Sequence, residues 1–137
     1  MKSFLLKCLL VIICFFSLTL YFYIIKNDDK NLTVFQVGAY RNLSNANLKA
    51  LEKDGIVYKE NDTYNVLIAA YSNDDVIIKM QNYYDNLGEE YYLKKIHVDD
   101  EYLDLISRYE NMILYSSDES IYSNLNKLLI SSIEEYL

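Results

Sequence analysis

The hydrophobic positions near the start of the chain form one unbroken run. From Cys8 to Ile25 there are 18 consecutive uncharged residues, with Lys7 and Lys26 on either side. A helix with a rise of 1.5 Å per residue would cover roughly 27 Å over this length, close to the thickness of the hydrocarbon core of a bilayer. The run ends in bulky residues, whereas a signal-peptide cleavage site requires small ones. Residues 8–25 are therefore predicted to form a retained transmembrane helix.

The charges that flank this segment say little about its orientation. Two lysines precede it and two follow it, so the positive-inside comparison is a tie apart from the terminal amino group. A short N-terminal flank such as residues 1–7 usually stays in the cytoplasm. We therefore expect a single-pass protein of the cell membrane with residues 26–32 as a linker and the rest of the chain outside the cytoplasm.

Beyond the anchor, the hydrophobic period switches between two and about 3.6, which indicates a mixture of strands and helices. In the first such segment Phe35, Val37 and Ala39 share one face of a strand, which puts Gln36 on the other. The pattern predicts, in order, a strand at 33–40, a helix capped by Ser44 that stops near a left-handed Gly55, strands at 56–59 and 63–71, a helix from Asp74 or Asp75 to Gly88, and a strand at 90–98.

The predicted order β-α-β-β-α-β is that of a split βαβ, or ferredoxin-like, α+β fold. Such a unit has a four-stranded antiparallel sheet with both helices on one face, so the other face is expected to be open. A weak internal repeat agrees with this order, because the pattern VGAYxN at residues 37–42 reappears as IAAYxN at residues 68–73. Each copy stands where a strand leads into a helix.

The residues of this repeat resemble the two half-motifs of a SPOR (sporulation-related repeat) domain. The first half-motif is FQVGAY at residues 35–40 followed by Asn45 and Ala46, and the second is YNVLIAAY at residues 64–71, which has Ala-Ala-Tyr where the family usually has Gly-Pro-Phe. The resemblance covers residues 33–98. It implies the fold just described and binding to peptidoglycan, with a preference for glycan strands stripped of stem peptides, as arise at division septa.

The same resemblance implies a glycan-binding site on the open sheet face. The family's first-strand glutamine corresponds to Gln36; alternation in the third strand adds Asn65 and Leu67, and the family pattern of the fourth strand adds Tyr92 and Lys94. A glycan is rich in hydroxyl groups and uncharged apart from the lactyl carboxylate left when a stem peptide is removed. Amide groups, an aromatic ring and the Lys94 cation suit such a ligand. The alternative is that these are ordinary surface residues.

Residues 99–137 lie beyond the resemblance and are predicted to form a helical extension. Apolar residues recur at helical spacing on both sides of a break at Ser116-Ser117. The two stripes are Tyr102, Leu105, Ile106, Tyr109, Met112 and Ile113, and then Ile121, Leu125, Leu128 and Leu129. They could pack on each other, cover the domain, or dock on a division or sporulation protein, and the sequence does not choose among these.

Composition and charge narrow the function further. The net charge is −7 and the basic residues form no run, which argues against nucleic acid as a partner. Fifteen tyrosines with no tryptophan or proline are typical of a low-GC bacterial genome. Both cysteines, Cys8 and Cys14, lie in the apolar segment, and His97 has no second His or Cys near it in sequence. The sequence therefore predicts no metal, no cofactor and no catalytic residues.

Taken together, the sequence predicts a membrane-anchored, non-enzymatic protein that binds peptidoglycan glycan strands at division or sporulation septa. The alternative is an adaptor that uses the same domain and the helical tail to dock proteins of a division or sporulation complex.

Overall fold

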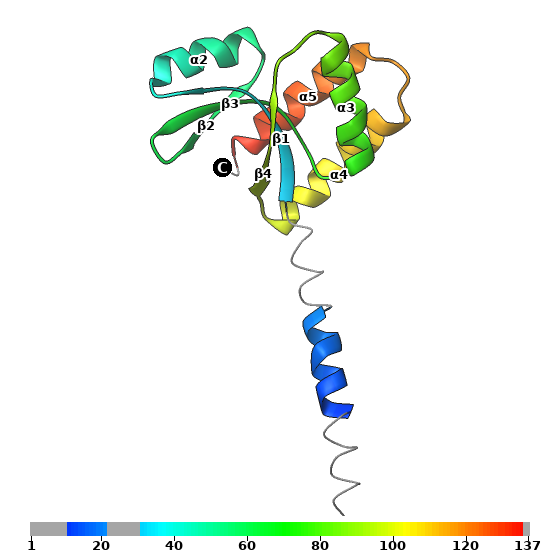
Figure 1. Cartoon of the computed structure of the whole chain (residues 1–137). Helices are drawn as coiled ribbons and strands as arrows, with labels where there is room; N and C mark the ends of the chain where they lie inside the picture. The colour runs from blue at the N-terminus through cyan, green and yellow to red at the C-terminus, as the bar shows by residue number, and fades with distance from the viewer. Residues whose placement is uncertain (1–10, 22–30, 136–137) are drawn as a thin grey trace, which may run out of the picture.

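The computed structural model describes residues 11–21 and 31–135 (Figure 1). Residues 11–21 form a helix in which every residue is exposed. Within the described ranges, no helix combines the length and the apolar character that crossing a membrane requires. The predicted span at 8–25 extends beyond the described residues at both ends, and the flank at 1–7 and most of the linker at 26–32 lie outside them.

The strands form one antiparallel sheet. They are β1 (Asn31–Tyr40), β2 (Ile56–Glu60), β3 (Thr63–Tyr71) and β4 (Tyr92–His97). Their order across the sheet is β2-β3-β1-β4, so β2 and β4 are the two edge strands. The α+β class and the four-stranded antiparallel sheet predicted from the sequence are confirmed.

Two helices connect these strands, and both are capped by an asparagine of the internal repeat. The side chain of Asn42 accepts a hydrogen bond from the backbone N–H of Ser44 (2.7 Å) at the start of α2 (Leu43–Glu52). Asn73 accepts in the same way from Asp75 (2.9 Å) at the start of α3 (Asp74–Asn86). The predicted cap at Ser44 is therefore wrong by two residues. The repeat VGAYxN encodes a strand end followed by a helix N-cap.

The turn that follows α2 differs from the prediction as well. The residue with the left-handed backbone is Asp54 (φ 52°), one position before Gly55. Gly55 is instead required by close packing, because a Cβ atom there would lie 2.5 Å from the backbone oxygen of Leu67. At the end of α3 the prediction holds, since Gly88 has φ +69°.

We expect Gly55→Ala to lower the free energy of unfolding by about 1–3 kcal/mol, because a backbone atom cannot move aside as a flexible side chain can. Thermal or urea denaturation of the variant would measure this. Gly88→Ala is the matched control: nothing lies within 4 Å of its Cβ position, so its cost comes from the positive φ alone. Equal stability of Gly55→Ala and the parent chain would contradict the close approach.

The sheet is irregular in its middle. The pairing of β1 with β3 shifts register between Phe35 and Gln36, and again between Gln36 and Gly38. Such bulges bend a strand and increase its twist. Before the first shift the pairing is regular, with Val34 opposite Ala70 and Phe35 opposite Ala69. Val34 and Phe35 are nevertheless both fully buried, so both faces of β1 are covered at this point.

The expectation of an open sheet face is wrong at β3. All residues from Asn65 to Tyr71 are buried, so both faces of this central strand are covered along most of its length. The reason is that the helical extension adds packing that a β-α-β-β-α-β unit by itself does not have.

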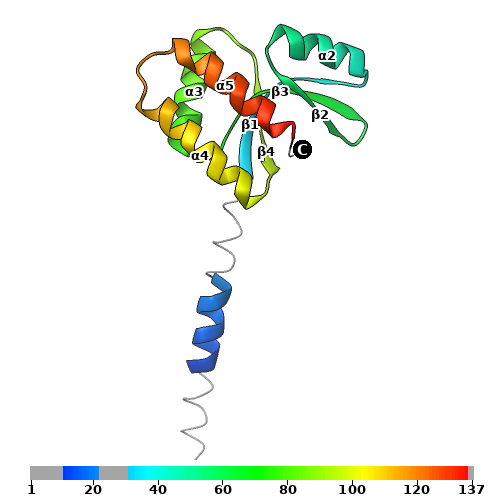
Figure 2. The ribbon, with the colours of Figure 1, turned by 180° about the vertical axis from the view of Figure 1, so that it is seen from behind.

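The extension consists of α4 (Asp100–Tyr115) and α5 (Ser120–Ile133). Seen from behind, α5 lies across the sheet, where it packs against β3 and α4 (Figure 2). Its apolar residues belong to the same hydrophobic cluster as the strands and α3, with Leu129 and Ile133 fully buried. Of the three possibilities left open by the sequence, the apolar stripes thus chiefly cover the domain.

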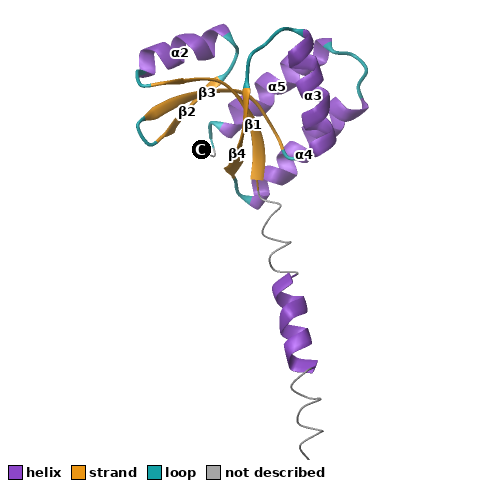
Figure 3. Cartoon of the chain, in the orientation of Figure 1, coloured by secondary structure: helices purple, strands orange, loops and turns teal. Residues whose placement is uncertain are grey.

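The helices occupy two ends of the sheet. Figure 3 shows α2 beside the β2–β3 hairpin, whereas α3 and α4 lie at the other end. A small second cluster, built on Ala46, Ala50 and Val66, lies under α2. Tyr40, at the end of β1, packs against this cluster.

Candidate functional site

Three of the five predicted site residues lie in a single row across the sheet. In the β-ladder Tyr92 of β4 is opposite Gln36 of β1, and Gln36 is opposite Leu67 of β3. Directly opposed residues project from the same face of a sheet. These residues differ in accessibility, since Tyr92 is 75% exposed, Gln36 is half-buried and Leu67 is only 1% exposed. Leu67 is therefore covered on this face, and Gln36 and Tyr92 are the residues of the row that a ligand could contact.

The other two predicted residues meet at a carboxylate that the sequence did not single out. Lys94 of β4 forms an ion pair with Glu60 of β2. The side-chain amide of Asn65, which is 4% exposed, also donates to Glu60, at 3.5 Å. Glu60 thus joins Lys94 to Asn65.

The Lys94–Glu60 pair connects the two edge strands of the sheet, although β3 and β1 lie between them. The bends introduced at Gln36 and Gly38 are consistent with this approach. Sequence reasoning missed Glu60 because it pairs with a residue on a strand that is not its neighbour. The only local signal was its place at the end of β2, directly before the hairpin turn.

We call Gln36, Tyr92, Lys94 and Glu60 the sheet-face site. It offers an exposed aromatic ring, an amide and a cation. The side chains of Lys94 and Glu60 are 33% and 40% exposed, and ion pairs of this kind contribute only about 0–1 kcal/mol. An anionic group of a ligand could therefore replace Glu60 at Lys94 at small cost.

We also searched the described residues for clusters of metal-binding side chains. No cluster of three or more His, Cys, Asp or Glu side chains in residues 11–21 and 31–135 could hold a metal ion. His97 is exposed and lies opposite Asn31 in the ladder between β1 and β4.

Comparisons with known proteins do not identify a relative: no family model matches the chain, and no curated protein or solved structure is significantly similar to it.

Proposed function

We propose that this protein is a membrane-tethered binding module whose sheet-face site holds glycan strands of peptidoglycan, at division or sporulation septa. The observation that carries the proposal is the row formed by Tyr92, Gln36 and Leu67, with Lys94 nearby on the same sheet. The protein is proposed to be non-enzymatic, with its N-terminus in the cytoplasm and its folded domain outside.

The fold supports this proposal. The element order β-α-β-β-α-β and the strand order β2-β3-β1-β4 are those of a split βαβ unit, the arrangement that the resemblance to SPOR domains implies. The internal repeat on which the resemblance rests has a structural counterpart, since Asn42 and Asn73 both cap helices.

The chemistry of the sheet-face site also suits a glycan. The exposed ring of Tyr92 can pack against sugar C–H groups, and the Gln36 amide can donate to and accept from hydroxyl groups. Lys94 would bind the lactyl carboxylate that is exposed when a stem peptide is removed, in exchange for its partner Glu60. A glycan that retains its stem peptides lacks this carboxylate and would leave the ion pair in place.

Attachment to a membrane is supported by the apolar side chains of residues 11–21. Phe15 and Phe16 are 70% and 69% exposed, and the polar side chains Ser17 and Thr19 hydrogen-bond to carbonyls of their own helix. Exposed apolar surface with internally satisfied polar groups is what a lipid environment favours.

The rival proposal, an adaptor that docks partners through residues 99–137, depended on apolar stripes available to a partner. Half of these residues, including Tyr102, Ile106 and Leu129, are buried in the domain's own core. Leu105, Tyr109 and Ile121 pack against that core, whereas Met112 and Leu128 are exposed. The glycan-binding proposal is therefore the one the geometry supports best.

Co-sedimentation with cell-wall sacculi tests the proposal. The full chain in detergent is expected to bind amidase-treated sacculi more strongly than untreated ones. Tyr92→Ala should weaken binding between about twofold and tenfold, the range expected for loss of one aromatic contact. Gln36→Ala should weaken it too. Tyr115→Ala, which removes an 83% exposed tyrosine of α4, is the matched control and should bind like the parent.

Variants of the Lys94–Glu60 ion pair are expected to change sacculus binding in opposite directions. Glu60→Gln frees Lys94 and is expected to strengthen binding to amidase-treated sacculi, whereas Lys94→Gln should weaken it. Equal binding to treated and untreated sacculi, or equal binding by Gln36→Ala and the parent chain, would rule the proposal out.

A further inference from the structure

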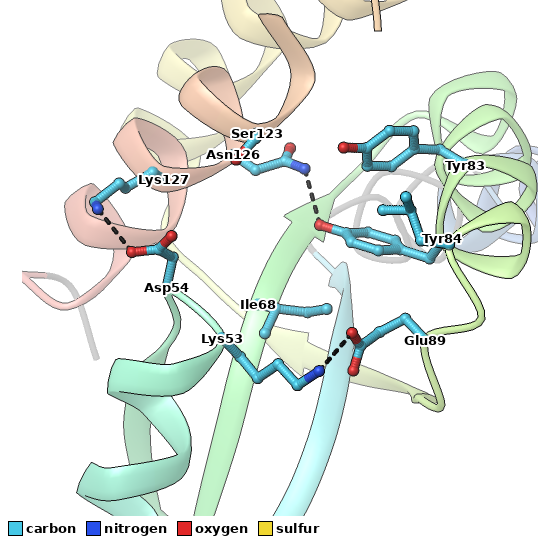
Figure 4. Close-up of a pocket in the computed structure, with 10 residues that line it drawn as sticks. Lys53, Asp54, Ile68, Tyr83, Tyr84, Glu89, Ser123, Asn126 and Lys127 are labelled. Carbon is cyan, nitrogen blue, oxygen red and sulfur yellow. Dashed lines mark hydrogen bonds and ion pairs between the residues drawn. The ribbon is translucent and has the colours of Figure 1, made fainter. Parts of the chain in front are cut away.

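The charges around the cavity beside Asn126 are paired with one another. This cavity, of about 130 Å³, lies between the ends of α2 and α3 and the middle of α5 (Figure 4). Lys53 binds Glu89 at 2.7 Å, and Lys127 binds Asp54 at 2.7 Å. At the inner end, the buried amide of Asn126 donates to a tyrosine hydroxyl of α3 at 2.9 Å. These polar groups hold the helices together, and a ligand would have to displace them.

A second hollow, of about 580 Å³, has charged groups without such partners. It lies at the tip of the β2–β3 hairpin, beside the point where β1 leads into α2. Within residues 11–21 and 31–135, the side chains that line it make no ion pair and no hydrogen bond. We call the lining residues the hairpin site: Arg41, Lys59, Asp62, Thr63 and Tyr64. Their charged groups are therefore available to a ligand from solution.

The β-ladder fixes the position of the hairpin site. Lys59 of β2 is opposite Tyr64 of β3, and Tyr64 is opposite Tyr40, the residue before Arg41. The Lys59 ammonium nitrogen lies 5.8 Å from the centroid of the Tyr64 ring, which packs against the small cluster under α2. Tyr64 and Leu67 are three positions apart on β3 and therefore project from opposite faces of the sheet. The hairpin site is thus separate from the sheet-face site.

The hairpin site carries one net positive charge on an acidic protein. Arg41 and Lys59 contribute two cations and Asp62 contributes one carboxylate, whereas the whole chain has a net charge of −7. The neighbouring carboxylate of Glu60 is occupied by Lys94. Several other lysines of the domain have carboxylate partners of their own, namely Lys49, Lys53, Lys94 and Lys127. A single negative charge would neutralise the hairpin site, and a second would be repelled by Asp62.

Hydrogen-bond donors are also abundant in the hairpin site. The guanidinium of Arg41 has five N–H groups, the ammonium of Lys59 has three, and Thr63 adds a hydroxyl. A carboxylate presents two oxygens in one plane, whereas a phosphate diester presents four oxygens at the corners of a tetrahedron and has the same single charge. An arginine fork also matches phosphate oxygens two at a time. Because the donors come from three separate segments, a tetrahedral group can meet more of them.

We infer that the hairpin site binds a phosphate diester, whose charged oxygens contact Arg41 and Lys59. The Thr63 hydroxyl then donates to a further oxygen, and the carbon groups beside the phosphate lie against the ring of Tyr64. Arg41, Lys59 and Asp62 are exposed, so the hollow is open to a ligand that continues on both sides of the phosphate. This site goes beyond the proposed glycan-binding function and does not depend on it.

Sodium dimethyl phosphate is the probe, added to the full chain in micelles of a non-ionic detergent at constant ionic strength. NMR signals of the backbone amides of Thr63 and Tyr64 report occupancy of the hollow. The diester is expected to shift these signals until they saturate. Acetate, which has the same charge but only two oxygens, is expected to bind about threefold more weakly.

Variants locate the binding. Arg41→Gln and Lys59→Gln should each weaken it about two- to fivefold, as expected for loss of one exposed charged contact. Asp62→Asn should strengthen it about twofold, because it removes the carboxylate that repels the ligand. The matched control is Lys95→Gln. Lys95 is an exposed lysine of β4 that also has no ion-pair partner among the described residues, and its replacement should leave the affinity unchanged.

Bilayer nanodiscs distinguish the two sources of a phosphate diester. If discs of phosphatidylglycerol shift the same signals and Arg41→Gln abolishes the shift, the ligand is a lipid headgroup; if only dimethyl phosphate does so, it is a soluble diester. Equal affinity for acetate and dimethyl phosphate would overturn the inference. So would no shift with any of these probes, or an equal loss of affinity in Lys95→Gln and Arg41→Gln. Sacculus binding is assigned to the other face of the sheet, so the two proposals fail independently.

Discussion

Replacing Leu129 with alanine is expected to lower the free energy of unfolding by about 3 kcal/mol, within the range of about 2–5 kcal/mol for buried leucines. Leu129 lies in α5 and is fully buried, in the hydrophobic cluster that also contains Leu67 and Ala70 of β3. Removing its side chain leaves a cavity between the helical extension and the rest of the core. The measurement is chemical denaturation followed by circular dichroism, with a shift of the midpoint at unchanged slope.

The adjacent residue provides the control. Leu128 is on the same helix but is 56% exposed, and Leu128→Ala should change stability by less than about 0.5 kcal/mol. If both variants were as stable as the parent chain, α5 would not be part of the core.

The same packing predicts that a chain ending at Val98 loses its cooperative unfolding transition, because α4 and α5 cover strands that would otherwise expose apolar side chains to water.

Glu110→Ala is expected to cost about 3 kcal/mol for a different reason. The carboxylate of Glu110, on α4, is 3% exposed and accepts hydrogen bonds from the backbone N–H groups of Ser72 (2.5 Å) and Asn73 (2.8 Å). Its second oxygen accepts from the Ser72 hydroxyl at 2.8 Å. The alanine variant leaves these donors without their partner, and one hydrogen bond to a charged group contributes about 1.5–3 kcal/mol. Because the donors are only partly buried, water can replace some of the three lost bonds, which keeps the total near the upper end of that range.

A graded pair of variants distinguishes hydrogen bonding from packing. Glu110→Gln keeps the shape and one acceptor oxygen, and its amide can donate to the Ser72 hydroxyl, so it should cost about 1 kcal/mol. Glu101→Ala, at an exposed position of the same helix, should be close to neutral. Urea denaturation of the three variants gives the comparison. Equal losses for Glu110→Ala and Glu110→Gln would show that charge, rather than hydrogen bonding to the strand end, is what matters.

The positions of Leu129 and Glu110 show why the sequence pattern predicted the strands and helices but not how α4 and α5 complete the core. The strands, their order along the chain and both connecting helices follow from local signals, because periodicity and turn residues act over a few neighbouring positions. The hydrogen bond between Glu110 and Ser72 joins residues 38 positions apart, and the sequence around neither residue predicts it.

The same distinction applies to the candidate sites. Gln36 and Tyr92 could be assigned to one surface from alternation and resemblance, and the ladder pairs them directly. Leu67 and Asn65 were assigned to that surface by the same rule, but they are buried, because alternation says which face a residue is on and not what covers that face. The cavity beside Asn126 was not predicted, since its lining comes from the ends of α2 and α3, from β3 and from the middle of α5, which meet only in the folded chain.

The sequence by itself thus determined the apolar N-terminal segment, the α+β class and the β-α-β-β-α-β order, because these depend on local hydrophobic period and on capping residues. Only the tertiary structure decided that α4 and α5 complete the core, that Glu60 pairs with Lys94, and that α5 forms a cavity with the ends of α2 and α3. The physical reason is that burial and ion pairing between distant residues depend on how the strands bend and on which apolar faces meet. A pattern confined to neighbouring positions contains neither.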